Sequence, residues 1–360
     1  MSAEAKQLVL DAIQSGFPLE HDPYGALASQ LELTRGQVRS AVAELRADGT
    51  IRRIGASFSS RKLGYSSTLC ALAAPGGEAE VDRIAGLVSA HPEVTHNYLR
   101  DGEFNVWFTV IAASELEVEK ILDEIRSETG CSVLSLPATT VYKIKVDFSG
   151  LGDSSEAGRS LGAGRGHVLR QSCFGEMSTG HFASCGTARV APPRTERAAL
   201  SFDSGDSFDV ALVRAVQGDL GDGEFPFSEL GLDEGRALER LREWKADGTV
   251  RRFGAFVRHR KMGFAFNGMT VWDVPADECA RVGAAFAGLA CVSHCYERPR
   301  SAVWPYNLYA MVHAKTAEEL DERVSELREL SGLDCRVLVS RKEYKKASPV
   351  YFNELRGRFV

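Results

Sequence analysis

The sequence predicts an α+β protein made of two tandem copies of one plan, each a helical region followed by a β-α-β-β-α-β unit. One observation is that ELRADGTIRRIGASFSSRKLGY (44–65) recurs as EWKADGTVRRFGAFVRHRKMGF (243–264). Another is that VTHNYLR (94–100) recurs as VSHCYER (292–298). Two matches of this kind at nearly the same offset indicate an internal duplication of the whole unit.

Each copy begins with the pattern of a winged helix-turn-helix. In the first copy, KQLVLDAIQ has apolar residues at helical spacing, and PYGALASQL follows as a short helix. The third helix has Thr34 as its N-cap and Gly49 as its C-cap, and TIRRIGASFS then alternates like a strand. The second copy repeats the order with FDVALVRAVQ, FPFSELGL, DEGRALERLREWKADG and TVRRFGAFV.

Each copy continues with the elements of a ferredoxin-like sandwich. In the first copy STLCALAAP predicts a strand, EAEVDRIAGLVSAH a helix, and VTHNYLR with FNVWFTVIA a hairpin. SELEVEKILDEIRSETG is a second helix, and CSVLSLPATTVYKIKV ends in strand. This β-α-β-β-α-β order places both helices on one face of the sheet. The second copy repeats it with four further residues in its hairpin, around 300–303.

We therefore predict five regions along the chain. They are a winged helix-turn-helix at 1–58, a ferredoxin-like domain at 59–148, a flexible linker at 149–203, a second winged helix-turn-helix at 204–257 and a second ferredoxin-like domain at 258–360. The linker is rich in Gly and Ser and lacks apolar periodicity. Its His181 and Cys185 could form part of a metal site, but isolated residues in such a segment are usually not ligands.

The composition is that of an ordinary soluble protein. No apolar run approaches the roughly 20 residues that a membrane helix needs, so we expect no membrane association. The start of the chain lacks the pattern of a signal peptide, and the eight cysteines are dispersed without a CxxC pair. We therefore expect reduced thiols and a cytoplasmic protein.

The repeated strand presents a row of reactive side chains. His96, Tyr98 and Arg100 lie two residues apart, so they share one strand face over roughly 13 Å. The second copy repeats the row with His294, Tyr296 and Arg298. Imidazole and phenol can donate protons, and a guanidinium can hold a carboxylate with two hydrogen bonds. A strand His is more often a core residue and a terminal Arg is usually solvated, but the parallel row favours function.

Other polar motifs are less specific. The wing pairs Arg52–Arg53 and Arg251–Arg252 would touch phosphate in a DNA-binding protein, or else substrate carboxylates. Strand neighbours face opposite ways, so at least one Arg of each pair is expected to be merely solvated. Cys291 and Cys295 flank His294, but a strand holds them about 13 Å apart, which is too far for one small ion. Neither third helix is strongly basic and the net charge is −6, so DNA binding is expected to be weak.

A winged helix followed by a ferredoxin-like domain resembles the Lrp/AsnC family of transcription regulators. ADGTIRRIGA, HNYLRDGEFNVWFTV and HCYERPRSAVWPYNLYAMV more specifically resemble its siroheme decarboxylase branch, in the fused two-subunit NirDL arrangement. The resemblance covers nearly all of the chain outside the linker. It implies a carboxy-lyase of d1-heme or alternative heme biosynthesis, which removes the carboxyl groups of two acetate side chains of siroheme to give didecarboxysiroheme.

The resemblance also implies partners. Iron arrives within the anionic siroheme, so no separate cofactor is expected. The parent family dimerises through its ferredoxin-like sheets, so the two halves should pair as an intramolecular pseudo-dimer, and further homologous decarboxylase subunits are candidate partners. Two other functions stay open. One is a ligand-responsive regulator, which salt-dependent retention on duplex DNA would favour, and the other is a heme-binding protein without catalysis.

Siroheme is a flat macrocycle ringed by carboxylates, so its pocket needs apolar walls, cations at the rim and proton donors near the acetates. On this resemblance His96 and His294 are either axial ligands of the substrate iron or proton donors. The tyrosines of the row would donate a proton or hydrogen-bond a carboxylate, and the arginines would clamp carboxylates. The further substrate-binding candidates are Arg52, Arg53, Asn105, Lys143, Arg251, Arg252, Trp304, Tyr306, Asn307 and Lys345. The second copy offers more of them, so it is favoured if only one half is active.

Overall fold

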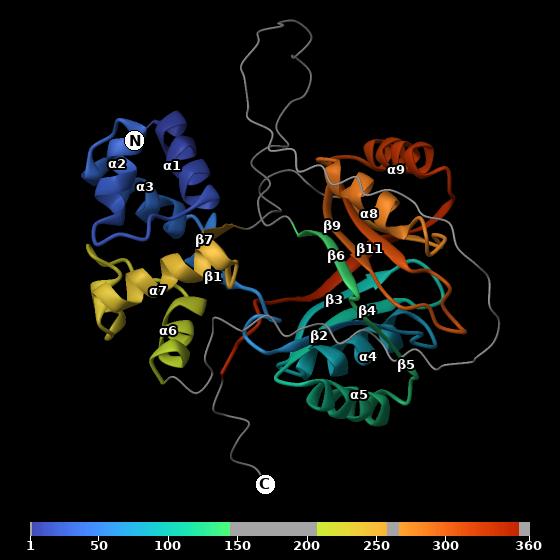
Figure 1. Cartoon of the computed structure of the whole chain (residues 1–360). Helices are drawn as coiled ribbons and strands as arrows, with labels where there is room; N and C mark the ends of the chain where they lie inside the picture. Colours follow the sequence, from blue (N-terminus) through green and yellow to red (C-terminus); the bar gives the residue numbers. More distant parts are fainter. Residues whose placement is uncertain (1, 145–206, 258–265, 353–360) are drawn as a thin grey trace, which may run out of the picture. The chain divides into compact units, whose positions relative to one another are not determined.

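The computed structural model describes residues 2–144, 207–257 and 266–352. The predicted linker, with His181 and Cys185, lies outside the described residues. The α+β class and the tandem arrangement of helical and ferredoxin-like parts are confirmed (Figure 1).

The helical part of each copy follows the predicted order. The first copy has α1 (Ala3–Ser15), α2 (Pro23–Leu31), α3 (Arg35–Ala47) and β1 (Ile51–Phe58), and the second has α6 (Ser207–Gln217), η1 (Ser228–Leu230), α7 (Glu234–Asp247) and β7 (Val250–Val257). Thr34 is the N-cap of α3, and its side chain and that of Gln37 form a capping box. The helix predicted at FPFSELGL is only the single 3-10 turn η1, because Gly231 follows it in the left-handed conformation at φ +70°.

The two wing strands pair with each other. β1 and β7 form an antiparallel two-stranded sheet in which Gly55 lies opposite Gly254. A Cβ at Gly55 would lie 2.3 Å from the carbonyl oxygen of Gly218, and one at Gly254 would lie 2.5 Å from that of Ile13. The glycine of the repeated Gly-Ala is therefore required where each wing meets a helix of the other copy. One apolar core serves both helical regions.

The ferredoxin-like parts form nine paired strands. Those of the first copy are β2 (Ser66–Leu72), β3 (Val94–Arg100), β4 (Val106–Ala112), β5 (Val133–Pro137) and β6 (Thr140–Ile144), and those of the second are β8 (Phe266–Trp272), β9 (Val292–Glu297), β10 (Leu308–Ala314) and β11 (Cys335–Lys346). Their order is β5-β2-β4-β3-β11-β8-β10-β9-β6. β6 thus pairs with β9 of the second copy, while the end of β11 pairs with β3 of the first. The two halves exchange their last strands, so the sequence boundaries at 148 and 258 do not separate the strands into two independent sheets.

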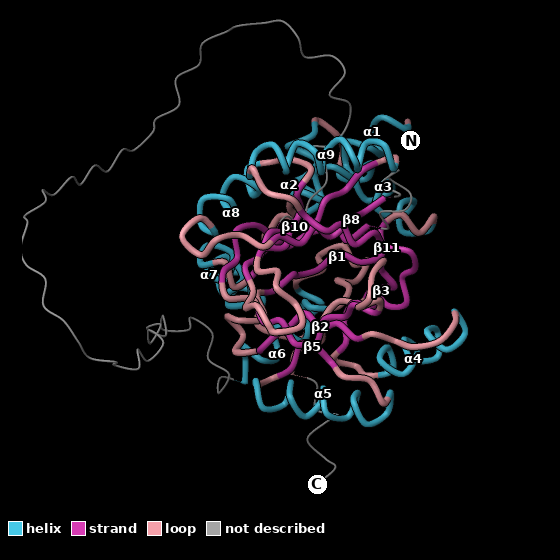
Figure 2. The backbone as a smooth tube through the Cα atoms, turned by 90° about the vertical axis from the view of Figure 1, so that its right-hand side faces the viewer, coloured by secondary structure: helices cyan, strands magenta, loops and turns pink. Residues whose placement is uncertain are grey.

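Helices cover the outer faces of these strands. They are α4 (Glu78–Ala90) and α5 (Glu115–Thr129) in the first copy, and α8 (Cys279–Gly288) and α9 (Ala317–Ser331) in the second. Figures 1 and 2 show the strands between the two helix pairs. A separate apolar layer joins the inner faces of both copies, and the rings of Trp107 and Trp304 are 5.4 Å apart in it. Burying two indoles in one layer stabilises the contact between the halves through the hydrophobic effect.

Candidate functional site

The predicted rows lie on the inner face of the strands. Asn97 donates to the carbonyl of Ala85 in α4, so its neighbours His96 and Tyr98 point the other way. Their rings stack with centroids 6.3 Å apart. Tyr98 also lies opposite Trp107 of the inner apolar layer.

The second copy repeats this geometry. The Cys295 thiol donates to the carbonyl of Gly283 in α8, and the His294 and Tyr296 rings stack on the opposite face with centroids 6.0 Å apart. Tyr296 lies opposite Tyr309 of the inner layer. Because burial raises the pKa of Tyr296, its phenol is protonated at neutral pH and can donate a hydrogen bond.

The two arginines of the rows are buried in reciprocal positions. Arg100 donates to the carbonyl of Leu338 at 2.9 Å, and Arg298 donates to that of Leu136. Each guanidinium therefore joins one copy to the backbone of the other. Burial lowers the pKa of Arg100 to about 10, which leaves it charged. This arrangement favours a role in holding the halves together over the carboxylate clamp expected from sequence, since these groups already have backbone partners in the interior.

Burial and nearby positive charges lower the pKa of both imidazoles. Burial, and then the charges of Lys346, His294 and Arg52, lower the pKa of His96 to about 4. The pKa of His294 is also about 4, because of burial and then the charges of Arg251 and Lys346. Both rings are partly exposed. They are neutral at pH 7, so each can accept a proton or a bond to iron, and a nearby carboxylate would raise its pKa.

The hydrogen bonds of the two imidazoles differ. His96 Nδ1 lies 3.0 Å from the hydroxyl oxygen of Thr95. His294 Nδ1 is buried and has no hydrogen-bond partner among the described residues. The equivalent hydroxyl, that of Ser293, lies instead 2.8 Å from Nε2 of His313. An unsatisfied buried nitrogen is uncommon in native proteins and is a candidate for a functional group.

Two open grooves lie where a wing approaches an exchanged strand. One of about 580 Å³ is lined by Ser15, Val141, Tyr142, Lys143, Ile144, Lys245, Gly248, Val250, Arg251 and Arg252. The other, of about 530 Å³, is lined by Arg52, Arg53, Arg214, Gln217, Gly218, Lys346, Ala347, Ser348, Pro349 and Val350. Every charged residue among these described linings is basic. Each groove also exposes an apolar side chain, Val141 or Val350. Cations with apolar surface suit an anionic, flat ligand.

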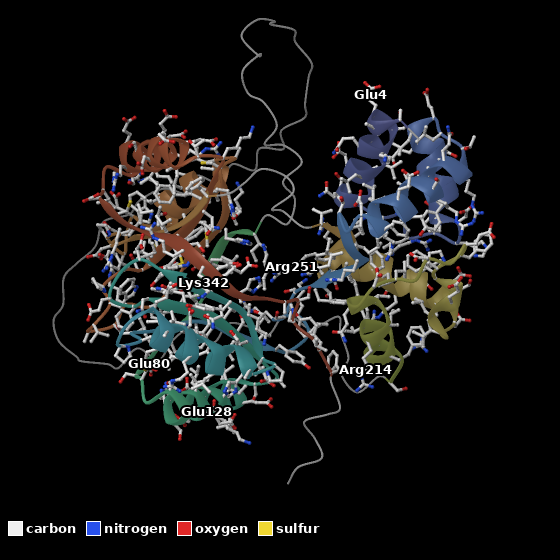
Figure 3. The ribbon with its side chains drawn as sticks, turned by 180° about the vertical axis from the view of Figure 1, so that it is seen from behind. Glu4, Glu80, Glu128, Arg214, Arg251 and Lys342 are labelled. Atoms are coloured by element: carbon white, nitrogen blue, oxygen red, sulfur yellow. The ribbon has the colours of Figure 1, made fainter. Side chains whose placement is uncertain are left out.

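The wing arginines divide as strand alternation predicts. Arg53 and Arg252 lie over the ring of Phe256, and they donate to the carbonyls of Gly218 and Gln14, respectively. Arg52 and Arg251 are exposed, and Figure 3 shows Arg251 on the side of the wing that approaches the strands. The exposed member of each pair is therefore the better candidate for a substrate carboxylate.

The two predicted lysines point toward helices. Lys143 Nζ donates to the carbonyl of Leu289 at the end of α8, although the residue lines a groove. Lys345 Nζ donates to the carbonyls of Ser89 and His91 at the end of α4. Irregularities in the pairing of both exchanged strands turn these residues to the helix side. Lys345 thus makes a helix C-terminal contact, and its role in substrate binding stays a prediction.

Four other predicted residues have structural contacts. Asn105 and Asn307 hydrogen-bond the backbone of Ala74 and Val274, so they fix chain segments and do not reach the grooves. Trp304 is buried in the inner layer, where it donates to the hydroxyl of Tyr309, and Tyr306 packs against it with ring centroids 4.9 Å apart. The extra hairpin residues of the second copy place these aromatics in the contact between the halves.

Sequence reasoning missed Lys346. It is exposed and lies opposite His96 across β11 and β3, on the inner face. The sequence does show two lysines, Lys345 and Lys346, at the end of β11. Strand alternation alone selects Lys345 as the substrate-binding residue, because it does not reveal the bulge that turns Lys346 to the inner face.

No group of three residues that could hold a metal ion occurs in the described ranges. Cys291 and Cys295 are buried.

None of the described helices is both long and apolar enough to cross a bilayer. Residues 62–143 and 261–345 match the family model of the AsnC-like ligand binding domain, and residues 6–52 match that of the siroheme decarboxylase NirDL-like HTH domain.

Siroheme decarboxylases match this chain over nearly its whole length or over one half of it. A siroheme decarboxylase of Hydrogenobacter thermophilus is 30% identical over 357 residues, which cover 96% of this chain and 94% of that protein. The siroheme decarboxylase alpha subunit of Desulfovibrio desulfuricans is 47% identical over 148 residues, which cover 41% of this chain and 84% of that subunit. The crystal structure of the siroheme decarboxylase NirDL in co-complex with an iron-uroporphyrin III analogue has a TM-score of 0.66 and 27% identity, covering 97% of this chain and 95% of that one.

Proposed function

This chain belongs to the siroheme decarboxylase family, and we propose that it is a carboxy-lyase that removes the carboxyl groups of two acetate side chains of siroheme. In each step the bond between the acetate methylene and its carboxylate breaks, carbon dioxide leaves, and the methylene carbon takes up one proton to become a methyl group. No oxidant or reductant is consumed. The product is didecarboxysiroheme.

One observation supports this proposal above the others. Each copy aligns an imidazole and a phenol on the inner face, and the charge of an exposed wing arginine acts on the imidazole. Exposed Arg52 and Arg251 are suited to holding carboxylates that are not lost, while His and Tyr are suited to proton delivery. General-acid help at the carbon would contribute roughly 10²–10⁴-fold in rate.

The imidazoles can serve the reaction in two ways. A neutral His is the form that coordinates iron, and the iron belongs to the substrate. A substrate carboxylate beside His96 or His294 would raise the pKa of that imidazole from about 4, which allows it to carry the proton that the methylene carbon needs. We propose that no separate cofactor takes part, because siroheme supplies both the iron and the conjugated ring that accepts electron density.

A DNA-binding regulator is the runner-up, and the candidate recognition helix argues against it. On α3, Arg46 forms ion pairs with Asp219 and Asp222 of the second copy. Arg35 of the same helix pairs with Asp22 and Glu224. Acidic side chains therefore neutralise two of the cations that would contact phosphate. The pairing of β1 with β7 also occupies both wings.

We place the protein in the cytoplasm, since the six described cysteines are free thiols, as is usual in a reducing compartment. The strand exchange makes each half the partner of the other within one chain. Some relatives are named as separate alpha and beta subunits, and we propose further subunits of that kind as candidate partners.

Anaerobic incubation of the purified protein with siroheme tests the function. We expect the substrate to lose two carboxyl groups, followed by mass spectrometry, with release of carbon dioxide and no need for an electron acceptor. Siroheme bound without loss of mass would favour a carrier. Retention on duplex DNA that falls with salt would favour a regulator.

A further inference from the structure

We propose that Lys346 binds a side-chain carboxylate of the tetrapyrrole beside His96, and that Ile144, the described residue paired with His294, gives the second half-site no equivalent cation at that position. The inference rests on the proposed function and names a residue of the same site.

The position of Lys346 follows from strand register. In the pairing of β11 with β3, Lys345 lies opposite Asn97 and Lys346 lies opposite His96. Directly paired residues of antiparallel strands share a face of the sheet. Asn97 and Lys345 both bond to the α4 segment, so His96 and Lys346 share the inner face.

The second half-site differs at the equivalent position. β6 pairs with β9 so that Lys143 lies opposite Cys295 and Ile144 lies opposite His294. The bulged register is the same, and the lysine of the first half-site is replaced by an apolar residue. Three residues earlier the contrast recurs, with Glu343 opposite Tyr98 and Val141 opposite Tyr296. The exchanged strand therefore gives the His96 half-site a charged edge and the His294 half-site an apolar one.

The surroundings of Lys346 suit an anion. It lines a groove with Arg52, Arg53 and Arg214, and the described lining of that groove contains no acidic residue. Arg52 reaches the hydroxyl of Ser348, two residues after Lys346. The positive charge of Lys346 also acts on both imidazoles, which places the ammonium near the two groups assigned to the reaction.

The test compares three variants of the full-length protein. Lys346→Met removes the charge and Lys346→Arg keeps it. Lys342→Met removes another exposed lysine of the same strand, which pairs with Asp82 (Figure 3). The dissociation constant of iron uroporphyrin III is measured by absorbance titration at two ionic strengths, and KM and kcat are measured with siroheme. Melting curves verify that each variant is folded.

For Lys346→Met we expect a dissociation constant and a KM raised by about tenfold or more, as for loss of a hydrogen bond to a charged group, with a weaker dependence on salt. Lys346→Arg should stay within about threefold of the wild type, and Lys342→Met should match it. Equal affinity and KM in Lys346→Met and the wild type would overturn the inference. If the wild-type protein binds iron uroporphyrin but releases no carbon dioxide from siroheme, the proposed function is wrong. The dissociation constants of the variants would still show whether Lys346 binds a carboxylate of the tetrapyrrole.

Discussion

In the first copy, His96 has the Thr95 hydroxyl beside Nδ1 and Lys346 across the strand pair, whereas in the second copy His294 Nδ1 has no described partner and Ile144 lies across. The shared features are the stacked His and Tyr, the exposed wing arginine and the buried arginine that reaches the other half. The two copies thus share the proposed reacting groups, while the immediate neighbours of these groups differ. Two copies of one sequence motif can therefore have different hydrogen bonds and charges around the same side chains.

The largest effect expected from this comparison is at the histidines. Because its Nδ1 is unsatisfied, His294 is the better candidate for proton transfer, so His294→Gln should lower kcat by about 10²–10⁴-fold. His96→Gln should act less on kcat and more on KM. Steady-state kinetics with siroheme measure both. A larger kcat loss in His96→Gln would reverse the assignment, and unchanged turnover in both variants would remove histidine from the mechanism.

The next effect is on stability below neutral pH. Both imidazoles have a folded-state pKa of about 4 against an ordinary value of 6.5, so the unfolded chain binds more protons between these values. Stability is therefore complete above pH 6.5 and falls as the pH is lowered toward 4, by at most about 3 kcal/mol for each histidine. Urea unfolding at pH 7 and pH 4.5 measures this loss.

The control for this prediction is the double variant His96→Gln/His294→Gln. It should lose less stability between the two pH values than the wild type does. Single variants would divide the effect between the halves. If the double variant shows the same loss as the wild type, other groups control the acid sensitivity.

The buried arginines should be equivalent, in contrast to the histidines. Arg100→Met and Arg298→Met each leave a backbone carbonyl of the other half, Leu338 or Leu136, without its donor. Each should lower the free energy of unfolding by about 1–3 kcal/mol, which urea denaturation measures. Exposed Arg52→Met should change stability by less than about 0.5 kcal/mol. A large KM effect with unchanged stability would instead favour the carboxylate clamp.

The fold was predictable because its signals are local and occur twice. Helical spacing, the Thr34 cap and strand alternation each depend on near neighbours, and the duplication repeats the overall pattern in a second copy. Two features depend on the assembled fold and escaped prediction. The exchange of β6 and β11 needs long-range pairing, and the bulges that turn Lys143 and Lys345 outward and Lys346 inward have no signature in the alternating pattern.

The site was predictable to the same extent. Alternation placed His96 and Tyr98 on one face, and the structure keeps them there. It also placed Arg100 on that face, but only the approach of Leu338 from the other copy shows that the guanidinium is buried. Asn105 was predicted as a substrate-binding residue because it belongs to a repeated motif. A residue whose amide holds the backbone of Ala74 is also repeated in both copies, so repetition alone does not distinguish a structural residue from a functional one.

The smallest expected effect concerns the hydroxyl beside His96. Thr95→Val removes the partner of His96 Nδ1 and makes this imidazole resemble His294, so it should lower kcat/KM by less than about tenfold, in keeping with one neutral hydrogen bond. Ser293→Ala is the matched control, because Ser293 bonds His313 and not His294. It should leave kcat/KM within about twofold of the wild type. An effect of Ser293→Ala as large as that of Thr95→Val would mean that both hydroxyls act through strand packing, and the difference between the half-sites would then rest on Lys346 and Ile144 alone.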